Sequence, residues 1–194
     1  MKRLFASLIC MLLLFSGAYA QKIYLVAAGI SDYPGNDHDL RLPAKDAKKV
    51  CWLYQTNKKA STVLLTDSKA TKSSILSNIK KQFAKAGKKD IVVFYFSGHG
   101  YPGGFVCHND EELTYGEVRK AMSLSQSLNK MIFADACFSG NMRENKNGNG
   151  SSNSNANVML FLSSRDNETS LESPFLANGF FTTALQNGLR GGAD

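Results

Sequence analysis

Histidine and cysteine are scarce in this chain, and their scarcity narrows the chemistry that it can carry out. The 194 residues contain three histidines and four cysteines. His99 and Cys137 would supply two ligands to a metal ion, but neither His38 nor His108 lies at a spacing that would add a third. A metal centre is therefore a weak hypothesis.

The chain also lacks an apolar run long enough to cross a membrane. Its longest run, Leu4–Phe15, is shorter than the ~20 residues that a spanning helix needs. A basic pair, Lys2-Arg3, precedes this run, and the small residues of Ala18-Tyr19-Ala20 follow it. This is the pattern of a secretory signal peptide. We therefore expect residues 1–20 to be removed, no membrane span to remain, and the mature chain to be periplasmic or secreted.

A basic stripe with interleaved aromatic residues is missing as well. The formal net charge is +7, but the lysines are dispersed through helix-like segments on faces that we expect to be solvated. This distribution argues against a nucleic-acid partner. Residues 21–194 are enough for one domain with a real core and too few for two. We expect that domain to be a monomer.

Three cysteines remain after residue 20, and an odd number in an exported protein leaves at least one free thiol. Cys51 lies among apolar residues in a helix-like segment, which favours a packing role. Cys107 could pack in the same way or pair with Cys51. The sequence leaves these two possibilities open.

Strand-like and helix-like segments alternate along the rest of the chain. Apolar, β-branched runs predict strands at 22–30, 61–65, 90–96, 131–134 and 158–162, and longer periodic segments predict helices at 43–56, 71–83, 114–122 and 179–189. Residues 103–108 predict a short strand extension or a hairpin. The alternation predicts an α/β fold layered around a largely parallel sheet. The continuous apolar run 90–96 is expected at the centre of that sheet.

Two threonines mark the starts of predicted helices. Thr71 is the expected N-cap of the 71–83 helix, whose apolar residues repeat every four positions. Thr114 and Glu117 have the spacing of a capping box. By contrast, residues 141–157 are rich in Asn, Ser and Gly and cannot bury enough apolar surface to order themselves, so we predict an exposed, flexible linker there.

Two predicted strands end in small-residue turns that each carry one reactive side chain. His99 follows the 90–96 strand, and Cys137 follows the 131–134 strand. In open α/β sheets, functional residues gather at the carboxyl ends of the strands. The pairing favours a Cys/His nucleophilic site over the alternative of a buried cysteine and an unrelated turn histidine.

The surroundings of both residues suit thiol chemistry. A glycine-flanked turn gives a cysteine the exposure that a reactive thiolate needs. His99 could relay the proton that expels a leaving amine. The backbone amides of Gly100 and Cys137 could then form an oxyanion hole.

Asp135 lies two positions before Cys137, at the end of a buried strand, where a charge is costly. Strand alternation places its side chain on the same face as that of Cys137. We favour a pocket residue that pairs with a cationic group of the substrate. The alternative is a turn carboxylate that accepts hydrogen bonds from nearby amides.

These motifs resemble those of a known family. Ser97-Gly98-His99-Gly100 and Asp135-Ala136-Cys137-Phe138-Ser139-Gly140 are similar to the His and Cys motifs of caspase-like cysteine peptidases, particularly bacterial metacaspase-like members of the group that includes clostripain and gingipain. Residues 26–33, 42–47 and 163–170 resemble the first strand, the next helix start and the border of the substrate groove. The resemblance covers nearly all of residues 21–194. It implies a three-layer sandwich, with helices on both faces of a mostly parallel sheet.

The resemblance also implies a division of the chain. Residues 21–140 correspond to the family's large half, 141–157 to the linker and 158–194 to a small half. Relatives usually continue further, so we expect this small half to be truncated. Family members often cut themselves between the halves, which makes Arg143 and Lys146 candidate self-cleavage sites.

The activity implied is hydrolysis of peptide or protein substrates by a Cys137/His99 dyad through an acyl-enzyme, with no required cofactor. Asp135 stands where caspases carry Gln, and Asp46 matches a second acidic pocket position. Both imply Arg or Lys as the P1 residue, the one whose carbonyl is attacked. Ser163 and Ser164 are implied to contact the substrate.

Some alternatives stay open. Many metacaspases are activated by calcium, and Asp110, Glu111 and Glu112 form a candidate calcium site, although a solvated turn fits them equally. A catalytically silent, peptide-binding module is a second possible function, and the joint presence of the dyad and Asp135 argues against it. An acyl-transferring enzyme on the same dyad is a third, which the sequence cannot separate from a hydrolase.

Overall fold

A five-stranded parallel sheet forms the centre of the computed structural model, which describes residues 20–58, 60–137, 158–164 and 179–192. Its strands are β1 (Ile23–Gly29), β2 (Ser61–Thr66), β3 (Ile91–Ser97), β7 (Asn129–Asp135) and β8 (Val158–Leu162). They lie in the order β2-β1-β3-β7-β8, and every neighbouring pair is parallel. The predicted sheet is confirmed, with β3 in its middle position.

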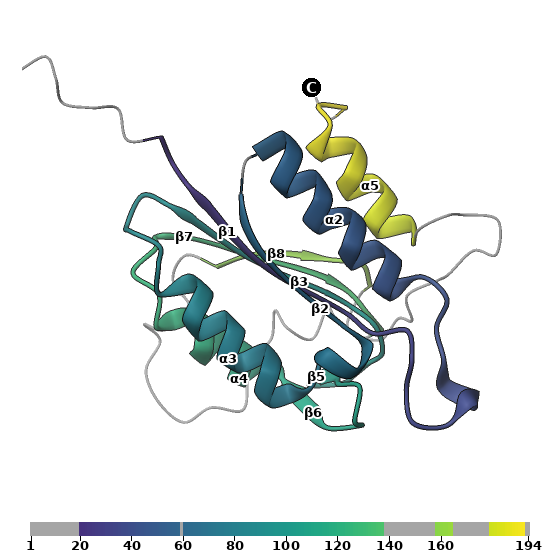
Figure 1. Cartoon of the computed structure of the whole chain (residues 1–194). Helices are drawn as coiled ribbons and strands as arrows, with labels where there is room; N and C mark the ends of the chain where they lie inside the picture. The colour runs from purple at the N-terminus through teal and green to yellow at the C-terminus, as the bar shows by residue number, and fades with distance from the viewer. Residues whose placement is uncertain (1–19, 59, 138–157, 165–178, 193–194) are drawn as a thin grey trace, which may run out of the picture.

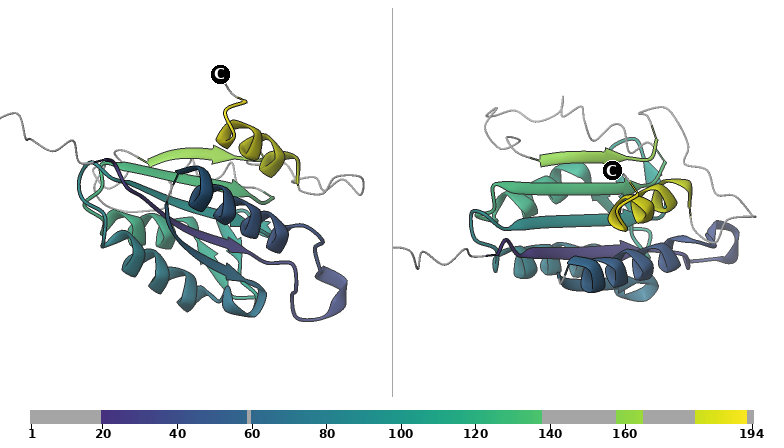
Figure 2. Two further views of the ribbon diagram at one scale, coloured as in Figure 1. Left: turned by 45° about the horizontal axis from the view of Figure 1, so that its top comes forward. Right: turned by 90° about the horizontal axis from the view of Figure 1, so that it is seen from above.

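Helices cover both faces of this sheet (Figure 1). One face carries α2 (Pro43–Lys58) and α5 (Phe180–Leu189), which lie side by side in both views of Figure 2. The other face carries α3 (Lys72–Phe83) and α4 (Tyr115–Ser123). The expected three-layer arrangement is therefore confirmed. Within the described ranges, no helix combines the length and apolarity that a membrane span requires.

Two apolar cores fill the spaces between the layers, and strand alternation assigns residues to them. On β3, Phe94 and Phe96 pack toward α3 and α4, whereas Tyr95 packs toward α2. All three side chains are fully buried. A strand buried on both faces reads as a continuous apolar run because neither set of alternate side chains meets water. His99 lies two residues after β3, at the carboxyl end of this central strand.

A small antiparallel sheet extends the molecule beyond the end of β3. It consists of β4 (Gly100–Tyr101), β5 (Gly104–Val106) and β6 (Glu112–Thr114), in that order. The sequence predicted a short extension or hairpin at 103–108, and the structure contains a hairpin of β4 and β5 with a third strand added. Because β4 starts one residue after His99, this sheet fixes the direction in which the chain leaves the histidine.

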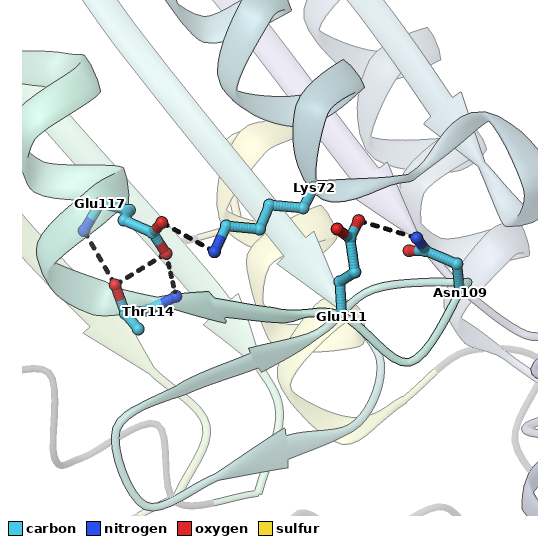
Figure 3. A network of polar contacts seen from close by, with 5 residues as sticks. All are labelled: Lys72, Asn109, Glu111, Thr114 and Glu117. Carbon is cyan, nitrogen blue, oxygen red and sulfur yellow. Dashed lines mark hydrogen bonds and ion pairs between the residues drawn. The ribbon is translucent and has the colours of Figure 1, made fainter.

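The helix starts follow the predicted caps. The Thr71 side chain accepts a hydrogen bond from the Ser74 amide, and Thr114 and Glu117 form a reciprocal capping box. Figure 3 shows that Lys72, at the start of α3, reaches across to Glu117, with 2.7 Å between Nζ and Oε1. The same carboxylate therefore caps α4 and joins it to α3.

Cys51 and Cys107 do not form a disulfide bond. Cys51 and Cys107 are buried free thiols that belong to the cores on opposite faces of the sheet. Burial raises the pKa of Cys51 to about 11, and burial together with the nearby Glu111 raises the pKa of Cys107 to about 12. Both residues therefore stay protonated near neutral pH and serve the packing role that the sequence allowed.

Two sequence predictions concern residues that the structure does not describe. The signal peptide of residues 1–20 lies outside the described ranges except for Ala20. The linker 141–157, with the candidate cleavage sites Arg143 and Lys146, also lies outside them.

Candidate active site

The turns that carry His99 and Cys137 lie against each other at the carboxyl end of the sheet. Ser97 is the register partner of Asp135, and the Gly98 amide donates to the Asp135 carbonyl at 3.2 Å. A Cβ added to Gly100 would fall only 2.2 Å from the carbonyl oxygen of Cys137. A side chain at position 100 is therefore excluded, and the two turns are in direct backbone contact.

The imidazole of His99 has a defined orientation. Its Nε2 lies 2.7 Å from the carbonyl oxygen of His38. A carbonyl only accepts hydrogen bonds, so the proton sits on Nε2 and the lone pair of the neutral ring sits on Nδ1. His38 therefore contributes through its backbone, at the end of the 3-10 helix Asn36–His38, and not through its ring. This contact was not predictable from the sequence, because any residue supplies a carbonyl.

Tyr33 contacts His99 through both its hydroxyl and its ring, and it was not identified from the sequence as a site residue. Its hydroxyl accepts a hydrogen bond from the His99 amide at 2.9 Å and donates to the Val106 carbonyl at 3.4 Å. The two rings pack at 4.7 Å between centroids with a tilt of 51°. Burial raises the pKa of Tyr33 above its ordinary range, so the phenol stays protonated. Tyr33 thus fixes both the backbone and the ring of His99.

The Cys137 thiol is half-buried and follows a backbone segment that β8 holds in place. The Ala136 amide donates to Ser163 Oγ at 3.2 Å, and Ser164 Oγ donates to the Ala136 carbonyl at 2.9 Å. The sequence placed Ser163 and Ser164 among the substrate-binding residues. In the structure, their hydroxyls contact the peptide groups on either side of Ala136, directly before Cys137, and their contact with substrate stays a prediction.

The two predicted pocket carboxylates converge, although they are far apart in sequence. Asp135 ends β7 and is 9% exposed, and Asp46, in the first turn of α2, is 1% exposed. Gly179 lies between them: its amide donates to Asp46 Oδ2 at 3.1 Å, and a Cβ on it would fall 2.9 Å from Asp135 Oδ2. The structure therefore brings together an acidic pair, Asp46 and Asp135, that the family resemblance implies for one pocket.

Asp135 is further engaged by a residue that the sequence did not single out. Thr182, a fully buried residue of α5, has its Oγ1 3.1 Å from Asp135 Oδ2 and 2.6 Å from the hydroxyl of Tyr95. No motif in the sequence identifies Thr182 as a partner of Asp135. Its importance depends on the packing of α5 against β3.

The acidic residues at 110–112 do not converge in the same way. Asp110 occupies a left-handed turn position with φ of 59°, and its amide bonds back to the Cys107 carbonyl. The Glu111 carboxylate accepts from Asn109 at 2.7 Å (Figure 3). Throughout the described part of the chain, no three His, Cys, Asp or Glu side chains are grouped as a metal site. These contacts form a turn, and calcium binding by this segment stays a prediction.

Comparisons with known proteins agree with this geometry. The caspase domain family matches residues 24–194. Protein GSU0716 from Geobacter sulfurreducens has a similar structure, with a TM-score of 0.70, 19% identity, and coverage of 88% of this chain and 83% of that one. Caspase-1 from Spodoptera frugiperda is also similar, with a TM-score of 0.66, 14% identity, and coverage of 88% and 69%.

Because these identities are low, the two structures support the fold alone. Among curated proteins no match is found. The family match, in contrast, spans the strands, the helices and both reactive turns described above. The chain therefore belongs to the caspase domain family of cysteine peptidases.

Proposed function

We propose that this protein is an exported endopeptidase that cleaves peptide bonds after arginine or lysine, with Cys137 as the nucleophile and His99 as its proton carrier. The observation that carries the proposal is the convergence of Asp46 with Asp135, which lies two residues before Cys137. Buried carboxylates that share a site favour a cationic partner, since it offsets both their repulsion and their desolvation. A guanidinium or ammonium group of the substrate has that charge.

The orientation of His99 supports its role in the reaction. With Nε2 donating to His38, the basic Nδ1 takes the thiol proton of Cys137 as Sγ attacks the carbonyl carbon of the substrate. Breakage of the C–N bond then returns that proton to the leaving amine and leaves a thioester on Cys137. Water, deprotonated by the same nitrogen, attacks the thioester and releases the acid together with the free thiol.

The close contact between the two turns supports an oxyanion site at the same place. Both proposed donors, the amides of Gly100 and Cys137, belong to backbone segments that touch. Fixed backbone donors stabilise the developing oxyanion without a reorganisation cost, and the loss of one such donor typically costs about 10²–10³ in kcat. Ser163 and Ser164 favour such fixation because they hold the peptide groups on either side of Ala136.

The proposal includes export through residues 1–20, to the periplasm or the exterior, action as a monomer without a cofactor, and self-cleavage after Arg143 or Lys146. The basic residues in the linker fit the specificity that the acidic pair favours. We do not extend the proposal to calcium, because Asp110, Glu111 and Glu112 are arranged as a turn. Intact-mass analysis of the protein beside Cys137→Ala tests self-cleavage, which the variant should abolish.

The decisive experiment for the activity uses two covalent cysteine probes, one with arginine and one with aspartate at P1. The purified protein is incubated with each, beside Cys137→Ala, and labelling is read by intact mass. We expect labelling by the arginine probe that is lost in Cys137→Ala.

Three other outcomes would contradict part of the proposal. Preference for the aspartate probe would contradict the role of Asp135 and Asp46. No labelling by either probe would point to a silent binding module. Products that carry an added amine in place of water would identify an acyl-transferring enzyme on the same dyad.

A further inference from the structure

A chain of buried polar groups connects the middle of the sheet to the acidic pair through α5. Tyr95, on the central strand, and Thr182, on α5, are both fully buried, and Asp135 is nearly so. The Tyr95 hydroxyl lies 2.6 Å from Thr182 Oγ1, which lies 3.1 Å from Asp135 Oδ2. Three segments that are remote in sequence therefore meet in one hydrogen-bonded series.

The direction of this series follows from its chemistry. An ionised carboxylate only accepts, so the single hydroxyl proton of Thr182 is donated to Asp135. Thr182 must then accept from Tyr95. Burial, followed by the charges of Asp135 and Asp46, raises the pKa of Tyr95 well above its ordinary value, so the phenol keeps the proton that it donates. Both hydrogen bonds consequently point toward the carboxylate.

The start of α5 supports the other carboxylate at the same time. Gly179 is the N-cap of the helix, and its amide donates to Asp46 Oδ2. The positive end of the helix dipole thus faces the acidic pair. Gly179 also allows the approach, because a Cβ would lie 2.9 Å from Asp135 Oδ2 and 3.3 Å from Asp46 Oδ2. One turn of α5 therefore contacts both acids.

We propose that Thr182 is a positioning residue for substrate selection: its hydroxyl, backed by Tyr95, fixes the Asp135 carboxylate for the cationic P1 side chain. This inference rests on the proposed preference for arginine or lysine. It adds that the small half of the chain, through α5, completes a pocket whose acids belong to the large half. Thr182 does not touch the reacting atoms and acts through Asp135.

The test compares Thr182→Val with Thr182→Ser. Valine keeps the shape of threonine and removes the hydroxyl, whereas serine keeps the hydroxyl. A matched control is Thr183→Val, because the Thr183 hydroxyl donates to the Gly179 carbonyl, which also accepts a hydrogen bond from the Thr183 amide. For each protein, kcat and KM are measured on an arginine peptide, and the alkylation rate of Cys137 is measured with iodoacetamide, which needs no P1 pocket.

A hydrogen bond to a charged group contributes enough that we expect Thr182→Val to lower kcat/KM roughly 10- to 100-fold, mainly through KM. The kcat/KM of Thr182→Ser should stay within about threefold of the parent value, because serine keeps the hydroxyl. The kcat and KM of Thr183→Val should match those of the parent. The alkylation rate of Cys137 in Thr182→Val should also match that of the parent. Tyr95→Phe, which removes the outer hydroxyl and keeps the ring, should raise KM by a smaller factor and carries the test if Thr182→Val does not fold.

Several results would overturn the inference. Parental KM in a folded Thr182→Val, equal losses in the valine and serine variants, or a parallel fall in alkylation would each show that the hydroxyl does not position the acid. If Thr182→Val does not fold, parental KM in Tyr95→Phe would do the same. Failure of the parent itself to act on arginine peptides is a distinct result, which overturns the proposed function together with this inference.

Discussion

Gly100 offers a direct test of the contact between the two reactive turns. In Gly100→Ala, the new Cβ would start 2.2 Å from the carbonyl oxygen of Cys137 and 3.1 Å from the Ala136 Cβ. Ordinary carbon contacts are about 3.5–4.0 Å, so the backbones must separate by about 1 Å or more. The nearest obstacle is the main-chain carbonyl of Cys137, which no side-chain rotation can move away.

Two magnitudes follow from this displacement. Forcing an extra methyl group into a packed site typically costs about 1–3 kcal/mol of stability. A misplacement of about 1 Å between catalytic groups costs about 10²-fold in rate. We therefore expect Gly100→Ala to remain folded at 25 °C, with a lower midpoint of urea unfolding, and to lose about 10²-fold in kcat/KM on an arginine peptide.

Gly116→Ala is the matched control, because it adds the same methyl group where there is room. Gly116 lies in α4, and the nearest atom to its added Cβ would be Thr114 Oγ1 at 4.0 Å. Replacing a helical glycine by alanine should stabilise the protein by about 0.5–1 kcal/mol. Its activity should match the parent. Parental kcat/KM in Gly100→Ala would refute the view that these turns must touch for catalysis.

Three further predictions follow from other contacts of the site. Ser164→Ala removes the hydroxyl that holds the carbonyl before the nucleophile, and should cost about 1–3 kcal/mol in urea unfolding and lower the alkylation rate of Cys137. Tyr33→Phe leaves the His99 amide without its acceptor, and should lower kcat more than KM in steady-state assays. The raised pKa values of Cys51 and Cys107, about 11 and 12, imply that thiols ionise first in the unfolded chain. Their share of the stability is therefore complete below about pH 8.5 and falls as pH rises toward the folded pKa, by up to about 1.4 kcal/mol per pH unit for each thiol. Urea unfolding at pH 7.5 and pH 10, with a shallower pH dependence in Cys51→Ala, checks this.

The sheet and both reactive turns were predictable because their signals are local. A continuous apolar run such as 90–96 predicts a central strand, and residues at the ends of parallel strands share one edge of the sheet. The caps at Thr71 and Thr114 were predictable for the same reason, because a cap depends on a few consecutive residues. Asp135 and Asp46 were placed together only through a family resemblance.

The support around the site was not predictable, because backbone groups and packing supply it. The His38 carbonyl and the Tyr33 hydroxyl reach His99 across more than 60 positions of sequence, and no residue pattern marks such contacts. Ser163 and Ser164 contact Ala136 because β8 pairs with β7, and no local pattern marks that contact. Thr182 depends on the docking of α5, which a single sequence does not specify.

The dependence of the acidic pair on α5 also sets an order of events during biosynthesis. The bond from Gly179 to Asp46 spans 133 positions, and the bond from Thr182 to Asp135 spans 47. A polypeptide is made from its amino end, so Asp46, His99 and Cys137 leave the ribosome before α5 does. Until that helix docks, Asp46 and Asp135 lack their hydrogen bonds with Gly179 and Thr182. Under the proposed specificity, cleavage after basic residues is therefore expected only once α5 has docked.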